Sequence, residues 1–155
     1  MKAIIIYYSK HHGNTKKLID AIEKEFSITC IDASQITEYD LSEYDLIGFA
    51  SGIYAFQFHP SILEFAKRNL LSGQQVFLLY TCASPNHRYC KSIQKIVEEK
   101  HATVVGSFGC NGWNTFGPFK LIGGTSKNHP DQKDLEHAVD FYRSLLEKVS
   151  PSKKD

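Results

Sequence analysis

Ala3-Ile4-Ile5-Ile6-Tyr7-Tyr8, followed by Ser9-Lys10-His11-His12-Gly13-Asn14-Thr15, is the stretch that decides the fold of this chain. The first run is continuously apolar and rich in β-branched and aromatic residues, which predicts a strand covered on both faces. After the polar run, apolar side chains recur at helical spacing at Leu18, Ile19, Ile22 and Phe26. A strand that enters a helix through such a loop points backbone N–H groups and the positive end of the helix dipole beyond the strand. We therefore expect an anion there, most simply a phosphate.

Composition sets the class of protein. The chain has 155 residues, of which 42% are hydrophobic and 23% charged, as in ordinary globular domains. We expect one domain over residues 1–149, large enough to fold without metals or disulfides, and a frayed tail over 150–155. The net charge of +1, with both signs spread along the chain, gives no reason to expect nucleic acid or a membrane as partner.

The cellular compartment follows from what the sequence lacks. The first apolar run is too short for a signal peptide, and no window approaches the roughly 20 apolar residues of a membrane span. We expect a cytoplasmic monomer. The four cysteines contain no Cys-x-x-Cys pair, so reduced thiols are expected. Cys82 and Cys90 leave a redox-sensing pair open as an alternative.

The rest of the chain alternates between strand and helix patterns. Further strands are predicted at 27–32, 44–51, 76–80 and 103–108, and helices are predicted to begin near Ser61, Pro85 and Asp131. The run 119–122 is expected to extend or rejoin the last strand. Five strands alternating with helices predict an α/β fold, a three-layer doubly wound parallel sheet.

Ligands of such folds sit beyond the carboxyl ends of the strands. The segments expected there are 9–15, 51–59, 81–86 and 111–117. Loops are usually polar, yet these contain the aromatic residues Tyr54, Phe56, Phe58, Trp113 and Phe116. A planar aromatic ligand held between rings, with its phosphate at the first helix, would explain them.

These residues carry a family resemblance. The segment 9–15, with its flanking strand and helix, resembles the phosphate loop of flavodoxins, and the segments 48–54 and 113–124 are similar to one branch of that family. The similarity runs from residue 2 to about 146. It implies a flavodoxin-like fold with strand order 2-1-3-4-5 and FMN bound without a covalent bond.

The resemblance also assigns the binding residues. The phosphate loop would comprise Ser9, Lys10, His11, His12, Gly13, Asn14 and Thr15. The loop at the reactive edge of the flavin would comprise Ser51, Gly52, Ile53 and Tyr54, and the loop at the pyrimidine side Thr81, Cys82, Ala83 and Ser84. Tyr54 and Trp113 are expected to stack on the flavin, and Gly52 could adopt the positive φ that a peptide flip beside N5 requires.

Three features depart from the family pattern. His11 and His12 stand where flavodoxins carry hydroxyl residues, and Lys10 adds a positive charge, so we expect at least one histidine to contact the phosphate. The balanced charge differs from the acidic surface typical of flavodoxins. The segment 81–85 is not the common form of the third loop.

Simpler interpretations exist for each residue. Asn14 and Thr15 could merely cap the first helix, and Tyr54 and Trp113 could be core or partner-contact rings. His59 and His129, each before a proline, are expected at a turn or helix start. Neither the adjacent histidines nor the cysteines have metal-ligand spacing, so no metal is expected.

The function predicted from these observations is electron transfer between redox proteins, with no side chain acting as acid or nucleophile. An FMN-dependent NAD(P)H or quinone reductase is the main alternative, and a domain that has lost the cofactor is a third. Hydrolase elbow, Walker A and dinucleotide-binding motifs do not occur in the sequence.

Overall fold

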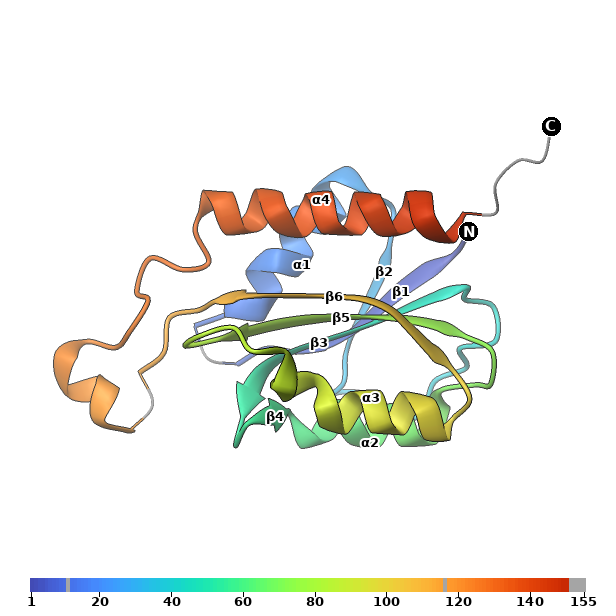
Figure 1. The fold of residues 1–155 in the computed structure, drawn as a ribbon, viewed down its shortest axis with the longest axis horizontal. Helices are drawn as coiled ribbons and strands as arrows, with labels where there is room; N and C mark the ends of the chain where they lie inside the picture. Colours follow the sequence, from blue (N-terminus) through green and yellow to red (C-terminus); the bar gives the residue numbers. More distant parts are fainter. Residues whose placement is uncertain (11, 116, 151–155) are drawn as a thin grey trace.

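Five parallel strands form the central sheet of the computed structural model, which describes residues 1–10, 12–115 and 117–150 (Figure 1). Their order across the sheet is β2-β1-β3-β5-β6, and a short β4 pairs antiparallel with β3. The bounds are β1 Ala3–Tyr8, β2 Thr29–Asp32, β3 Leu46–Tyr54, β4 Gln57–Phe58, β5 Gln75–Cys82 and β6 Thr103–Asn111. The predicted doubly wound α/β fold is confirmed, including the order of its parallel strands.

Helices cover both faces of this sheet (Figure 1). The long α4 (Gln132–Val149) lies with α1 (Asn14–Glu25) on one face, and α2 (Pro60–Asn69) lies with α3 (Lys91–Glu99) on the other. Two short 3-10 helices complete the chain, η1 (His87–Cys90) before α3 and η2 (Gly117–Ile122) before α4. Within the described residues, no helix is long and apolar enough to cross a bilayer.

Strand β1 shows why the opening sequence organises the fold. Ile4 and Ile6 are fully buried in the core beneath α2 and α3, while Ile5 is fully buried in the core beneath α1 and α4. A central parallel strand has two buried faces, so it needs no alternation of apolar and polar residues. The continuous apolar run therefore marked the centre of the sheet.

Two glycines in the sheet make room for aromatic rings on neighbouring strands. Gly48 on β3 lies opposite Phe77 on β5, and a Cβ at residue 48 would lie 2.3 Å from the ring. Gly109 on β6 lies opposite Tyr80 on β5, and its Cβ would lie 2.1 Å from that ring. Phe77 belongs to the core under α1 and α4, and Tyr80 to the other core. The ring fills the space that each glycine leaves.

The region after Ser51 differs from the prediction. The sequence predicted a loop there, but β3 continues to Tyr54 and turns back into β4. The turn is made by Ala55 and Phe56, both with positive φ. Neither is the glycine or asparagine that normally signals such a turn, and so the hairpin was not predicted.

Two helix predictions and one strand prediction need correction as well. His59, not Ser61, is the N-cap of α2, with Pro60 as the first helical residue. The helix expected from Pro85 begins two residues later as η1. The apolar run 119–122 belongs to η2 and not to a strand, because the chain has already left the sheet at Asn111. The predicted tail lies outside the described residues from 151 on.

Candidate functional site

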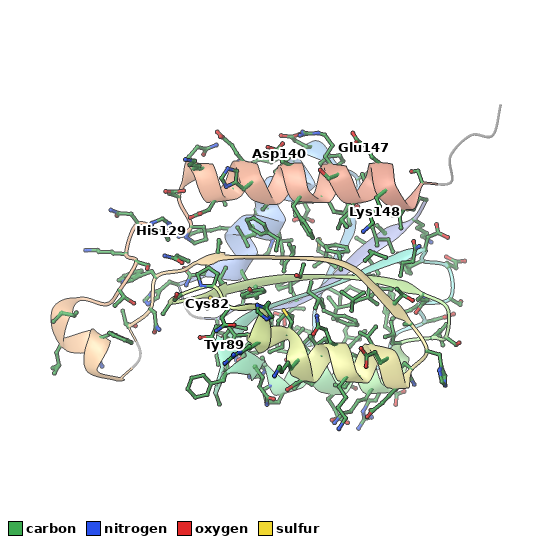
Figure 2. All side chains as sticks on the ribbon, in the orientation of Figure 1. Cys82, Tyr89, His129, Asp140, Glu147 and Lys148 are labelled. Atoms are coloured by element: carbon green, nitrogen blue, oxygen red, sulfur yellow. The ribbon has the colours of Figure 1, made fainter. Side chains whose placement is uncertain are left out.

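Four connecting segments meet at the carboxyl ends of the parallel strands. They are the described residues of 9–13, 52–59, 83–90 and 112–130, which leave out 11 and 116, and we call them the carboxyl rim. Figure 2 shows Cys82, Tyr89 and His129 at this end of the molecule, with Glu147 and Lys148 farther along α4. The sheet topology thus brings the predicted binding segments together.

The start of α1 is the part of the carboxyl rim suited to an anion. Gly13 is the N-cap, has a left-handed conformation with φ 63° and carries no side chain that could cap the helix. The first turn carries no acidic residue. Ser9 Oγ accepts a hydrogen bond from the Lys16 N–H at 3.1 Å, and Lys10 is exposed beside it. The positive end of the helix dipole is therefore not neutralised by a carboxylate of this turn.

Asn14 and Thr15 point inward and join this loop to the ends of two strands. Asn14 Nδ2 donates to the Trp113 carbonyl at 2.9 Å, and the Thr15 and Thr81 hydroxyls lie 2.9 Å apart. Both residues are buried, and neither caps α1 through its side chain. Asn14 Oδ1 is buried without a hydrogen-bond partner among the described residues. These two side chains fix the position of the loop relative to β5 and β6.

The hydroxyl pair gives a first prediction. Replacing Thr15 with Val should lower the free energy of unfolding by about 1 to 3 kcal/mol, because the buried Thr81 hydroxyl loses its partner. The double replacement Thr15→Val with Thr81→Val keeps the shape and removes both polar groups, so it should recover most of that loss. Urea unfolding of the wild-type chain, the two single variants and the double variant measures the coupling between the two hydroxyls. Additive losses would show that the pair does not act as a unit.

His12 and Trp113 form a first ring contact at the carboxyl rim. The imidazole stacks on the indole with centroids 3.7 Å apart and planes 22° apart, and His12 Nε2 lies 3.1 Å from Thr115 Oγ1. The indole Nε1–H donates to the Gly123 carbonyl at 3.0 Å. His12 thus covers one face of the ring expected to stack on a flavin. His11 lies outside the described residues, so the predicted histidine–phosphate contact stays a prediction.

Tyr8, His59 and Tyr54 form the second ring contact. Tyr8 and His59 are stacked with centroids 3.6 Å apart, and Tyr54 meets both rings edge-on, at 5.7 and 4.9 Å. Burial raises the pKa of Tyr54 to about 12. His59 Nδ1 accepts the Ser61 N–H at 3.1 Å, as expected for a residue at a helix start. Burial, and then the charge of Lys10, lower the pKa of His59.

The lowered pKa of His59 predicts how stability depends on pH. As pH falls, His59 takes up a proton near its ordinary pKa of 6.5 in the unfolded chain but not in the folded chain. The contribution of His59 to the free energy of unfolding is therefore complete above pH 6.5 and is lost as pH falls toward the folded pKa. His59→Asn keeps a capping acceptor without a titrating ring. Urea unfolding between pH 8 and 5 should therefore show a steeper loss for the wild-type chain. Parallel curves would contradict this prediction.

The residues predicted at the reactive edge of a flavin are part of the sheet. Ser51 is buried, donating its hydroxyl to the Gly52 carbonyl at 2.5 Å and accepting the His59 N–H at 3.0 Å. Gly52 pairs with Thr81, and Ile53 with Phe58, in the ladders of β3. Gly52 lies within the strand and has no positive φ, so the peptide flip beside a bound flavin stays a prediction.

The predicted third loop begins on β5. Thr81 is engaged with Thr15, and the Cys82 carbonyl accepts the Gly112 N–H at 2.9 Å. Ala83 is partly buried and Ser84 exposed. Burial raises the pKa of the Cys82 thiol to about 12 and that of Cys90 to about 11, and both cysteines are free. A raised pKa disfavours the reactive thiolate, so the geometry does not support a redox-sensing pair.

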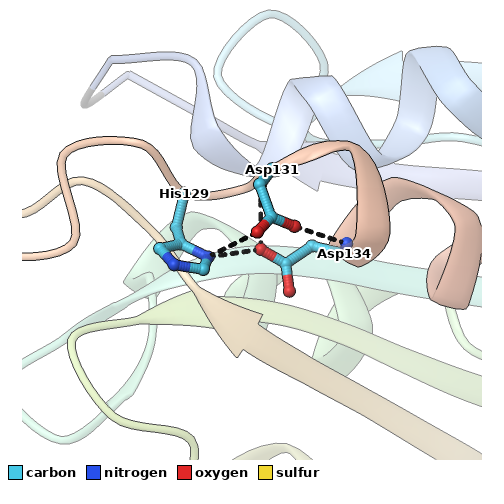
Figure 3. Close-up of side chains that lie close together, drawn as sticks. All are labelled: His129, Asp131 and Asp134. Carbon is cyan, nitrogen blue, oxygen red and sulfur yellow. Dashed lines mark hydrogen bonds and ion pairs between the residues drawn. The ribbon is translucent and has the colours of Figure 1, made fainter.

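A His–Asp–Asp cluster closes the segment that carries Trp113 (Figure 3). His129 Nδ1 lies 2.6 Å from an Asp134 oxygen and 3.8 Å from one of Asp131. The two aspartates also form the capping box of α4, and the His129 carbonyl accepts the Trp113 N–H at 2.9 Å. The hydrogen bond to Asp134 raises the pKa of His129. These contacts give the cluster a structural role at the start of α4.

Two surface grooves lie away from the carboxyl rim. One is lined by residues 38–40, 68 and 69, and the other runs between α1 and α4. Arg68 pairs with Glu38 in the first, and Arg143 pairs with Glu25 and Asp140 in the second. Neither groove lies at the carboxyl ends of the strands, where ligands of doubly wound folds bind, so we place the candidate site at the carboxyl rim.

Some residues of the site were not predicted from the sequence. Tyr8 was assigned to the strand and His59 only to a helix start, because stacking between residues 51 positions apart leaves no local signal. Gly112 was not assigned either. A Cβ there would lie 2.7 Å from Asn14 Nδ2, so the close approach of the two loops requires glycine. Its place just beyond a strand was the one available indication.

A flavodoxin domain model matches residues 4–112, which span β1 to β6 and include three of the four segments of the carboxyl rim. The chain belongs to the flavodoxin family. An uncharacterized protein of Methanocaldococcus jannaschii is 35% identical to this family member over 148 residues, covering 94% of this chain and 99% of that protein.

Solved structures with the same fold include Flavodoxin 2 from Bacillus cereus, 18% identical over 96% of this flavodoxin-family chain and 99% of that chain, with a TM-score of 0.70. General stress protein 14 of Treponema denticola, solved in complex with FMN, is 12% identical over 95% and 98% of the two chains, with a TM-score of 0.65. An NADPH-quinone reductase from P. pentosaceus is 7% identical over 94% and 97%, with a TM-score of 0.63. At these identities the likeness establishes the fold alone.

Proposed function

We propose that this chain binds FMN noncovalently at the carboxyl rim and carries electrons between redox proteins. The observation that carries the proposal is the start of α1. The N-cap of the helix is a left-handed Gly13 without a side chain, and the first turn carries no acidic residue. Ser9 Oγ accepts the Lys16 N–H of this turn, and Lys10 follows Ser9 in the loop. This is the donor set that a phosphate group needs. Membership of the flavodoxin family and the FMN complex of one structural neighbour support the same cofactor.

The residues of the chain fit the parts of this cofactor. Ser9, Lys10 and the first amides of α1 would hold the phosphate, and the rings of Tyr54 and Trp113 would contact the flavin. The indole face now covered by His12 becomes available to a flavin once His12 turns away. FMN, when bound, supplies the redox chemistry, while the chain binds it, orients it and sets the charges around it.

A reductase acting directly on NAD(P)H or a quinone is the second candidate, and the likeness to an NADPH-quinone reductase favours it. The two candidates differ in one measurable respect. A reductase oxidises NAD(P)H in the presence of FMN and a quinone without any other protein, whereas a carrier needs protein partners.

We propose a cytoplasmic carrier that acts as a monomer and keeps its cysteines reduced.

FMN titration tests the proposal. Fluorescence of FMN should be quenched on binding to the purified chain, and the complex should be yellow and reducible in steps. Failure to take up FMN would overturn the proposal and leave a domain that only binds partners. Steady oxidation of NAD(P)H by the purified FMN complex would instead establish the reductase.

A further inference from the structure

Positive and negative side chains are unevenly distributed on this protein although its net charge is near zero. The four segments of the carboxyl rim contain the cations Lys10, Arg88, Lys120 and Lys127 but no aspartate or glutamate. An even spread of the 17 carboxylates along the chain would place about four in these segments. All four cations are exposed. The four segments that form the carboxyl rim therefore carry only positive formal charges.

The carboxylates next to the carboxyl rim are already engaged. Asp131 and Asp134 follow it directly, but both face His129 and the start of α4. Asp32, at the end of the edge strand β2, accepts the Ser34 N–H at 2.8 Å within its own turn. A protonated His129 offsets one of the two aspartate charges next to the carboxyl rim. The start of α1, whose first turn has no acidic residue, adds further positive potential.

Exposed apolar side chains accompany these cations. Phe56, at the tip of the β3–β4 turn, is 80% exposed, and Leu121 and Ile122 on η2 are 89% and 74% exposed. Phe56 approaches Tyr89 of η1, with ring centroids 6.5 Å apart, next to Arg88. Apolar side chains surrounded by charges of one sign are typical of protein interaction surfaces. A solvated loop has no need to expose large apolar side chains.

We infer that the carboxyl rim is a docking surface for an acidic redox protein, one whose electron-transfer face carries aspartates and glutamates around an apolar centre. The inference rests on the proposed function, because a flavin at this end would exchange electrons through the same surface. The net charge of +1 is too small to attract an acidic partner. The local positive charge of the carboxyl rim can attract and orient one. The partner chemistry is thus the reverse of that expected for a flavodoxin with an acidic surface.

Calorimetric titration tests this inference with two reference proteins of opposite charge. The FMN-supplied chain should bind an acidic [2Fe–2S] protein at low salt, at least tenfold more weakly in 0.5 M salt, and should not bind basic cytochrome c. Exposed charges are largely screened at high salt, which explains the expected loss. The inference would be overturned if the chain bound cytochrome c more tightly than the acidic protein, or if its affinity for the acidic protein were the same at both salt concentrations.

Charge reversal locates the surface. Arg88→Glu with Lys120→Glu should weaken binding of the acidic protein at least tenfold at low salt. The control, Lys24→Glu with Lys67→Glu, changes the net charge equally on exposed positions near the other ends of α1 and α2, and should weaken it less than threefold. The inference would be overturned if both variants lost the same affinity for the acidic protein, or if the chain bound duplex DNA as tightly as that protein. Either result would show unspecific attraction between opposite charges.

FMN titration of the same samples separates the two proposals. A chain that takes up no FMN but binds the acidic protein through Arg88 and Lys120 refutes the proposed function and retains the docking surface. A chain that takes up FMN but binds the acidic protein equally after either charge reversal retains the function and loses the surface.

Discussion

Replacing Gly13 with Asp is expected to weaken FMN binding about 100-fold, equivalent to about 3 kcal/mol, and to leave the fold intact. A Cβ at residue 13 meets nothing within 4 Å, so the side chain enters open space at the start of α1. The left-handed backbone there is best tolerated, after glycine, by Asp and Asn. A carboxylate at this position complements the helix dipole but repels a phosphate in the same place.

Gly13→Asn provides the matched control. Asn has nearly the shape of Asp and the same backbone tolerance but no charge, so it should keep most of the affinity for FMN. Riboflavin, which lacks the phosphate, should bind both variants equally. Fluorescence titrations with the two ligands measure these affinities, and thermal unfolding checks the fold. Equal affinity of the Asp and Asn variants for FMN would place the phosphate away from the start of α1.

The opening sequence predicted this part of the site because its information is local. An apolar run, one glycine and a helical pattern are enough to define a strand, a loop and a helix start. The observed β1 and α1 have those positions, with Gly13 between them. The sheet order followed from the alternation of elements and the family resemblance, since right-handed connections allow few topologies.

The side-chain contacts could not be predicted in the same way. His12 stacks on Trp113, and Thr15 meets Thr81, across the ends of different strands. The sequence contains each residue type but not the register that brings the two together. The same limit applies to the turn at Ala55 and Phe56, whose positive φ depends on the β3–β4 pairing and not on a local glycine.

The need for glycine at positions 48 and 109 also depends on the register of neighbouring strands. Of the stability changes predicted here, that of Gly48 is the largest. Gly48→Ala should lower the free energy of unfolding by about 2 to 3 kcal/mol, because the new Cβ enters the ring of a fully buried Phe77. Alanine would normally be favoured over glycine in a strand by about 0.5 to 1 kcal/mol, so the expected sign is opposite to that of propensity. Urea unfolding measures the change.

Two further variants distinguish overpacking from a general intolerance of alanine in β3. Gly52→Ala lies on the same strand, where its Cβ would approach the ring of a partly exposed Tyr54 at 3.3 Å, and should change stability by less than about 1 kcal/mol. Phe77→Leu should rescue Gly48→Ala, since the smaller side chain vacates the position of the ring tip. If Phe77→Leu made the Gly48→Ala protein still less stable, the loss would not arise from this contact. Rescue would show that the glycine and the ring form one packing unit across two strands.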